Sequence, residues 1–354
     1  MSSHTQRISF VFAIAACGLG TLAIAPTLRA ESLAAFYANR QMAMLIGTTV
    51  GGGYDLFGRM IARHMGRHLP GGTARFVVRN MPGAGGVIAA NHVFNVAERD
   101  GSTIATVTRE IIFDPLLSGD TQSRFDARRF LWLGSPNLEV GMIYVSGITG
   151  IDSLEQARQR EVRLGTSGAS RSINAILPKL LNELIGTKFK VISGYPGSMD
   201  VIIAMERGEV DGRYSPGWAG PEANKVGELV AAGKARLLAY LSPQKSPALA
   251  GIPHIMEFAR GPGSEQILTL LLAPQALGRP FFAPPGIAED RAKALQDAFA
   301  ATMTDAEFQA EAAQQGFEIA PTLGAEMARF VNQVYATPKP LLDRAIALVS
   351  RAQR

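Results

Sequence analysis

Four segments rich in glycine and serine carry the residues best suited to chemistry in this 354-residue sequence. They are residues 49–55, 80–86, 166–172 and 194–198. Each follows a short apolar run and precedes an amphipathic stretch, so each is expected to join a strand to a helix. A helix start offers unpaired N–H groups and the positive end of a dipole, and glycine lets a ligand approach the backbone closely. Four such segments together predict an anion site, whereas one alone would indicate a turn.

Other kinds of site find little support. The phosphate-loop pattern G-x-x-x-x-G-K-[ST] does not occur, and Ile88 stands where a dinucleotide fingerprint needs a third small residue. His64 and His68 have helical spacing but lack the glutamate of an H-E-x-x-H zinc motif, so we expect them on a solvated helix face. The sequence therefore predicts no metal site and no cofactor.

A serine hydrolase is the one enzymatic alternative. Ser167 lies in Gly-Thr-Ser-Gly-Ala, which is similar to the G-x-S-x-G turn of that class. Its triad would have to combine Ser167 with Asp200 or Asp211 and with His254, the one histidine further along the chain. Because His254 follows Gly-Ile-Pro in an ordinary turn pattern, we predict that the protein is not an enzyme.

Alternating strands and helices must position the four segments. The alternation is typical of α/β proteins with largely parallel sheets, in which ligands bind beyond the carboxyl ends of the strands. Strands are predicted at residues 42–46, 75–78, 103–107, 140–145, 162–165, 190–192, 210–214 and 235–241. Helices are predicted at residues 54–69, 87–96, 153–160, 172–184, 199–207, 222–232, 288–303 and 324–351, the last broken near Pro338.

Composition excludes several classes of protein. The chain is 47% hydrophobic and 18% charged, which is ordinary for a folded protein and excludes a disordered one. One cysteine excludes a disulfide scaffold. A net charge of +5 is too weak for a nucleic-acid-binding face, and the length favours two domains.

Residues 1–30 are predicted to be an export signal cleaved after Ala30. A cationic start containing Arg7 precedes an apolar run over residues 8–28, and Arg29 and Ala30 close the segment. Cleavage would place the protein in the periplasm and, by removing Arg7 and Arg29, would lower the net charge from +5 to +3.

Two alternatives for this segment are less favoured. Gly18, Gly20 and Pro26 interrupt a membrane anchor, and a lipoprotein at Cys17 is disfavoured because the residues that follow stay apolar. No later stretch is long enough to span a bilayer, since Pro274 is expected to end the most apolar one, residues 267–273.

Several motifs together resemble the substrate-binding proteins of tripartite tricarboxylate transporters, also called the Bug family. They are Gly51-Gly52-x-x-Asp55-x-x-x-Arg59, Val77-Val78-x-Asn80-x-Pro82-Gly83-Ala84-Gly85-Gly86, Asp100-Gly101, Ser167-Gly168, Tyr195-x-Gly197 and Gly208-Glu209-Val210-Asp211. The resemblance spans nearly the whole chain after the signal. The sequence departs from the family pattern at residues 48–50, at Met81 and at Pro196, which leaves the identity of the solute open.

The resemblance implies a two-lobed α/β fold of the periplasmic-binding-protein type II class, each lobe a mixed, mostly parallel sheet flanked by helices. Lobe 1 would hold residues 31–139 and 246–354, and lobe 2 residues 140–245. A monomer of this kind captures a small carboxylate-type solute between its lobes, closes over it and delivers it to membrane permease subunits. A periplasmic sensory subunit is the alternative, and no nucleic-acid partner is expected.

The residues expected to bind the solute come from the four segments, from family markers and from two arginines. A guanidinium could hold a carboxylate through two nitrogens, with an ion pair as its alternative role. Asp55 could instead cap its helix. The full set is Thr49, Gly51, Gly52, Asp55, Gly83, Ala84, Gly85, Arg109, Ser167, Gly168, Ser170, Arg171, Tyr195, Gly197 and Asp211.

Overall fold

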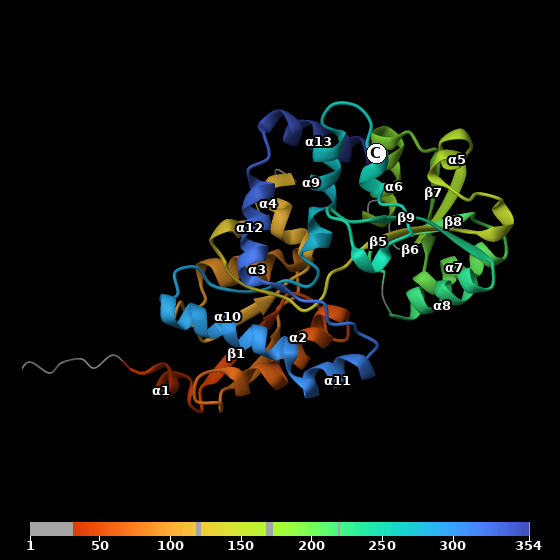
Figure 1. Cartoon of the computed structure of the whole chain (residues 1–354). Coiled ribbons are helices and arrows are strands. Elements are labelled where there is room, and N and C mark those ends of the chain that lie inside the picture. The colour runs from red at the N-terminus through yellow and green to blue at the C-terminus, as the bar shows by residue number, and fades with distance from the viewer. Residues whose placement is uncertain (1–30, 118–121, 168–172, 219, 354) are drawn as a thin grey trace, which may run out of the picture. The chain divides into compact units, whose positions relative to one another are not determined.

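Two mixed β-sheets flanked by helices organise the chain (Figure 1). The computed structural model describes residues 31–117, 122–167, 173–218 and 220–353. Both sheets belong to the compact unit Leu33–Arg354. The predicted export signal, residues 1–30, lies outside the described residues.

The first sheet has six strands within the described residues, in the order β11-β4-β10-β3-β1-β2. β1, β2 and β3 run parallel, whereas β10 and β11 pair antiparallel to their neighbours. Figure 1 shows that segments from both ends of the chain build this region, in red to orange and in blue. The strands are β1 (Gln41–Ile46), β2 (Arg75–Asn80), β3 (Thr103–Thr106), β4 (Leu131–Ser135), β10 (Phe281–Ala283) and β11 (Thr322–Leu323).

The second sheet has five strands in the order β7-β6-β8-β5-β9, again within the described residues. β6 is parallel to β7 and β8, and β5 is antiparallel to β8 and β9. All of its strands come from one continuous stretch of chain, so this sheet is an insertion between β4 and β10. The strands are β5 (Gly141–Ser146), β6 (Val162–Ser167), β7 (Phe189–Tyr195), β8 (Gly212–Ser215) and β9 (Ala235–Leu241).

Helices cover both sheets and fill the space beside them. The α-helices are α1 (Leu33–Tyr37), α2 (Gly53–His64), α3 (Val87–Asn95), α4 (Asp114–Leu117), α5 (Leu154–Gln159), α6 (Ile173–Ile185), α7 (Ser198–Glu206), α8 (Gly220–Ala231), α9 (Ser264–Ala276), α10 (Glu289–Thr304), α11 (Ala306–Gln314), α12 (Gly324–Tyr335) and α13 (Lys339–Ala352). The 3₁₀ turns are η1 (Met65–His68), η2 (Ala84–Gly86), η3 (Arg109–Phe113), η4 (Ala127–Arg129), η5 (Gly147–Thr149), η6 (Pro247–Leu249) and η7 (Ile255–Phe258).

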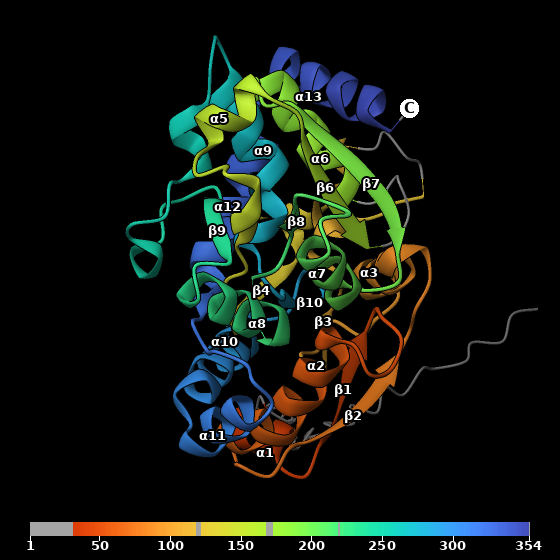
Figure 2. The ribbon, with the colours of Figure 1, turned by 90° about the vertical axis from the view of Figure 1, so that its right-hand side faces the viewer.

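The largest buried apolar cluster contains residues of both sheets. Trp132 of β4, Ile143 of β5 and leucines of α6, α9 and α13 belong to it. Figure 2 shows α13 beside α6 and α9, and Lys179 of α6 donates to the carbonyl of Ala352 at 2.8 Å. The last helix therefore packs on a helix of the second sheet although it follows the first sheet in the chain.

Most of the predicted strands and helices are present. β9 and the break between α12 and α13 are confirmed. The sequence patterns missed β4, β10, β11, α1, α4, α9 and α11. The expectation that Pro274 ends an apolar stretch was wrong, because α9 continues through it to Ala276.

In the part of the chain that the structure describes, no helix combines the length and the apolar character needed to cross a lipid bilayer.

Candidate functional site

Two of the predicted segments come together at the carboxyl edge of the first sheet. Ile46, the last residue of β1, is in register with Asn80 of β2 and Thr106 of β3, so the three strands end side by side. The loops that follow contact one another: the Asn80 side chain donates to the carbonyl of Thr48 at 3.0 Å, and Thr108 donates to the carbonyl of Gly85 at 2.7 Å. Residues 49–55 and 80–86 therefore form one surface.

The segment Gly83 to Gly86 has an unusual backbone. Its four consecutive residues have φ of 135°, 45°, 66° and 112°. Only glycine adopts such angles without strain, and Ala84 is one of two non-glycine residues with positive φ in the described chain. Successive residues of this kind can turn their N–H groups toward one concave point, which suits an anion.

Asp55 lies beneath the first loop and organises it. Its carboxylate is 1% exposed and accepts hydrogen bonds from the Gly51 amide at 2.9 Å, from Arg59 Nε at 3.0 Å and from Asn80 Nδ2 at 2.8 Å. Burial raises the pKa of Asp55, but these hydrogen bonds outweigh it and hold the pKa below its usual value. Asp55 thus supports Gly51, while Thr49, Gly51 and Gly52 are exposed.

The second sheet brings Ser167, Tyr195 and Gly197 to one edge. Ser167 ends β6 in register with Tyr195 at the end of β7, and Gly197 is the N-cap of α7 without a side-chain hydrogen bond. The predicted residues Gly168, Ser170 and Arg171 lie outside the described residues.

Asp211 does not join this edge. It precedes β8, at the opposite end of the strand from Ser215, and forms an ion pair with Arg163 at 2.7 Å. Burial opposes ionisation of Asp211, but hydrogen bonds and the charge of Arg163 lower its pKa. In this structure Asp211 anchors the start of β6 and β8.

Arg109 is buried in an ion pair, which was its alternative role in the sequence analysis. Its guanidinium contacts Glu139, lies 3.2 Å from Glu110 and donates to the carbonyl of Pro216 at 3.1 Å. Pro216 follows β8 and Arg109 follows β3, so this bond joins the loops at the carboxyl edges of the two sheets.

Sequence reasoning missed the partners of Arg109. Glu139, in the connection from β4 to β5, also pairs with Arg279 at 2.7 Å. Burial lowers the pKa of Arg279 to about 10, and the nearby charge of Arg109 adds to this effect. Trp218 reaches the same connection, because its backbone N–H donates to the carbonyl of Val140 at 2.8 Å. No local motif marks Glu139 or Arg279, since only folding brings them together.

A small cavity lies next to the Arg109–Pro216 contact. Its volume is about 30 Å³, and Arg109, Tyr214, Pro216 and Gln275 are among its lining residues. That volume holds about one water molecule and is too small for a dicarboxylate.

The hydrolase triad is not assembled. The Ser167 hydroxyl lies 3.5 Å from Arg213 Nη2, and His254 Nε2 lies 2.8 Å from the carbonyl oxygen of Ser242. His254 also stacks on Tyr240, with ring centroids 4.8 Å apart. The structure therefore contradicts the alternative in which His254 activates Ser167. Arg213, which no sequence pattern indicated, is the partner of Ser167.

The expectation that His64 and His68 lie on a solvated face was wrong. His64 is 7% exposed and His68 is partly buried, because both face α11 and the turn before it. His64 contacts Glu311 at 2.7 Å and His68 contacts Asp305 at 2.8 Å.

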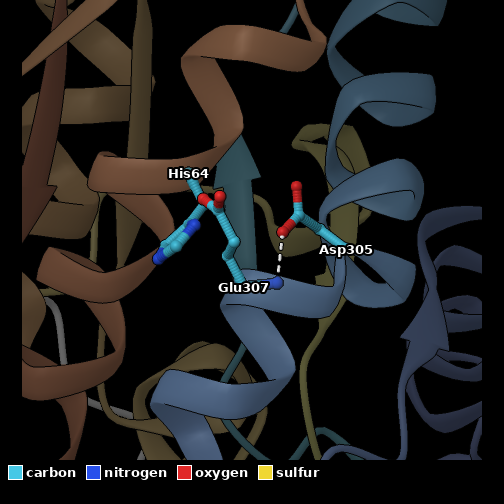
Figure 3. Close-up of side chains that lie close together, drawn as sticks. All are labelled: His64, Asp305 and Glu307. Carbon is cyan, nitrogen blue, oxygen red and sulfur yellow. Dashed lines mark hydrogen bonds between the residues drawn. The ribbon is translucent and has the colours of Figure 1, made fainter.

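His64, Asp305 and Glu307 lie close enough together to suggest a metal site (Figure 3). However, the guanidinium of Arg67 contacts all three: it pairs with Glu307, lies 3.3 Å from Asp305 and bonds to His64 Nδ1. It therefore takes the place that a metal ion would have. We interpret this cluster as an ionic contact between helices.

Comparison with known proteins gives matches among solved structures. No protein-family model and no curated protein matches the sequence. A TctC solute-binding protein from Polaromonas aligns with 87% of this chain and 99% of its own at 20% identity, with a TM-score of 0.67. The chain has the fold of the TctC and Bug solute-binding proteins.

Two further structures agree with this TctC/Bug fold. An R. palustris protein with adipate shares 23% identity over 86% of this chain and 97% of its own, with a TM-score of 0.56. The periplasmic binding protein BugD shares 20% identity over 89% of this chain and 98% of its own, with a TM-score of 0.52. The sequence resemblance is thus confirmed at the level of the fold, which is a two-lobed α/β fold.

Proposed function

We propose that the protein is an extracytoplasmic receptor that captures a small carboxylate-type solute between two lobes. In this proposal lobe 1 comprises residues 31–139 and 246–354, and lobe 2 residues 140–245. The receptor delivers its solute to the membrane subunits of a tripartite tricarboxylate-type permease. The chain reaches the periplasm through cleavage of residues 1–30 and acts there as a monomer, without catalysis.

One observation carries the proposal. Three helices begin just beyond the carboxyl edge of a sheet at a glycine that provides no side-chain cap: Gly52 before α2, Gly86 before α3 and Gly197 before α7. Ser153 and Asp305 cap α5 and α11 with side-chain oxygens, whereas α9, α10, α12 and α13 also lack a side-chain cap, so the position at the carboxyl edge of parallel strands is what distinguishes α2, α3 and α7. In α3 the Val87 N–H already donates to the carbonyl of Ala84, so the first N–H groups of α2 and α7 are the ones best placed for the oxygens of a ligand carboxylate.

The arrangement of the loops supports a ligand between the lobes. The hydrogen bond from Arg109 to the carbonyl of Pro216 joins the loop after β3 to the loop after β8. A ligand held by the Gly51–Gly52 and Gly83–Gly85 segments would then also meet the edge with Ser167 and Gly197. The adipate found with one protein of this fold is a ligand of the same chemical class.

A thermal-shift screen tests this function. We expect at least one acid among adipate, malate, citrate and benzoate to raise Tm by several degrees, because a ligand at 100 times its Kd stabilises the folded state by about 2.7 kcal/mol. The primary amide of the same acid should have a much smaller effect. If no carboxylate shifts Tm, the proposed function is wrong.

A further inference from the structure

Arg213 is a buried cation beside the second sheet's part of the proposed site. It lies in β8, opposite Tyr144 of β5 and next to Gly165 of β6, and only 2% of it is exposed. Its Nε donates to Glu222 at 2.9 Å. Its Nη2 lies 3.0 Å from the Ser198 hydroxyl oxygen and 3.5 Å from that of Ser167.

Within the part of the chain that the structure describes, Arg213 does not use all of its hydrogen-bond donors. The Glu222 oxygen that accepts from Arg213 also accepts from the Tyr144 hydroxyl at 3.0 Å. Within the described residues, Arg213 Nη1 is buried and has no hydrogen-bond partner. Buried charged groups are normally fully hydrogen-bonded, so an Nη1 with no partner among the described residues leaves Arg213 able to bind a further acceptor.

The guanidinium fixes the direction in which two hydroxyls can donate. Arginine only donates hydrogen bonds, so the oxygens of Ser167 and Ser198 must accept from Nη2. Each serine then keeps its own O–H proton for another acceptor. Both serines are only partly buried, whereas Arg213 lies behind them.

The start of α7 adds further donors at this place. Ser198 is the first residue of α7, and its N-cap Gly197 contributes no side-chain acceptor. The first N–H groups of the helix therefore lie beside two hydroxyls that donate. Among the acidic groups nearby, Glu222 lies on the far side of Arg213, and Asp200 in the first turn is exposed, so solvent screens its charge.

We propose that Ser167, Ser198 and the first turn of α7 form a subsite for one carboxylate group, and that Arg213 is its positioning residue. This inference rests on the proposed function and assigns a contact of the same ligand. Arg213 holds the two hydroxyls as donors and supplies a positive charge behind them. A subsite made of donors and backed by a cation selects an anionic group over its neutral amide.

The test measures affinity for the panel acid (adipate, malate, citrate or benzoate) with the largest thermal shift, and for its primary amide, by isothermal titration calorimetry. The double variant Arg213→Met/Glu222→Gln removes both buried charges together, which avoids leaving one unpaired. We expect its affinity for the acid to fall about 10- to 100-fold, as for a lost charge-assisted contact, with the affinity for the amide unchanged. Arg213→Lys should restore part of the preference for the acid.

Two further variants keep the test decisive. Ser167→Ala/Ser198→Ala leaves the Arg213–Glu222 pair in place and should lose at least 10-fold in affinity for the acid, even if the core variant does not fold. Arg163→Met, at the other end of β6, removes an arginine that pairs with Asp211 and should bind like the wild type.

The outcomes distinguish a failure of this inference from a failure of the proposed receptor function on which it rests. If the wild type binds a carboxylate and both double variants keep the same ratio of acid to amide affinity, the Arg213 subsite is overturned and the receptor function stands. If the wild type binds no acid of the panel, both are overturned.

Discussion

At the scale of single residues, backbone conformation distinguishes the two glycine-rich loops of the first sheet. Gly86 has φ of 112°, and a Cβ there would lie 3.3 Å from the Val107 side chain. Gly52 has an ordinary φ of −84°, and a Cβ there would meet nothing within 4 Å. One glycine is needed for the fold of its loop, whereas the other leaves space that a ligand can use.

We predict that alanine lowers stability at Gly86 and weakens ligand binding at Gly52. Gly86→Ala should lower the free energy of unfolding by about 1–3 kcal/mol, because alanine is strained at positive φ. Gly52→Ala should change it by less than about 0.5 kcal/mol but weaken binding of the panel acid, since its methyl group stands over the loop amides. Urea denaturation and calorimetry measure both effects. Equal losses of stability in the two variants would contradict this assignment.

The sequence indicates which residue types occur and how they are spaced, but not which contacts these residues make. The sequence indicated the glycines of the first two loops, and the structure places them on one surface. The sequence also left open whether Arg109 binds the solute or forms an ion pair within the protein. The Arg109–Glu139 contact shows the ion pair. Nothing in the sequence could indicate Arg213, because Ser167, 46 residues earlier in the chain, and Glu222 of α8 define its role.

At the scale of elements, the contact between α2 and α11 combines a buried apolar cluster, which includes Ile61 and Phe308, with a row of ion pairs. The second half of α2 and the following turn present Arg63, His64, Arg67 and His68 to Asp305, Glu307 and Glu311 of α11 and its cap. Figure 3 shows three of these side chains. Asp305 also caps α11, since its carboxylate accepts from the amides of Glu307 at 2.9 Å and Phe308 at 3.0 Å.

We predict that this contact weakens at acid pH. Burial raises the pKa of Asp305, but hydrogen bonds from Phe308, His68 and Glu307 and the charge of Arg67 bring it below its usual value of 3.8. Because the pKa is lower in the folded state, the extra stability is complete above about pH 4 and is lost as the pH falls through the folded pKa. Asp305→Ala should cost about 1–2 kcal/mol at pH 7 and reduce the acid dependence.

Urea denaturation at pH 7 and at several values below pH 4 measures this effect. Asp343→Ala is the matched control, because Asp343 forms an exposed i,i+4 pair with Lys339 and should cost less than about 0.5 kcal/mol. An unchanged acid dependence in Asp305→Ala would show that other groups determine it.

The elements that were missed lack the usual sequence signals. α9 contains Pro274 and is apolar on most of its surface, so it has no amphipathic period, yet it is buried beside η3 and α13. β10 and β11 have three and two residues, which is too short for a strand pattern. By contrast, β1 and α2 are long and strongly patterned, and the sequence indicated both.

At the scale of the whole molecule, the second sheet is inserted between β4 and β10 of the first sheet but is not isolated from it. The two connections to it lie close together, because Gly141 at the start of β5 pairs with Leu241 at the end of β9. Glu139, next to one of them, binds Arg109 and Arg279. We propose that movement of the lobes is absorbed in these two connections.

We predict that ligand binding makes the molecule more compact. A solute that contacts both lobes only when they are closed shifts the population toward the closed form. Small-angle X-ray scattering should show a smaller radius of gyration with saturating panel acid than without ligand. The primary amide, at the same concentration, should leave the radius unchanged. Binding of the acid without a smaller radius would contradict closure.

The two tryptophans are natural fluorophores that should report different events, because they lie in different surroundings. Trp132 is 2% exposed in the apolar core, so its emission should stay constant until the protein unfolds. Trp218 packs against Tyr144, which shares Glu222 with Arg213, and is tied to the connection at Val140. Trp132→Phe would therefore leave Trp218 as the single tryptophan, linked to Arg213 through Tyr144 and Glu222. Solute capture could then be followed in real time without an attached dye.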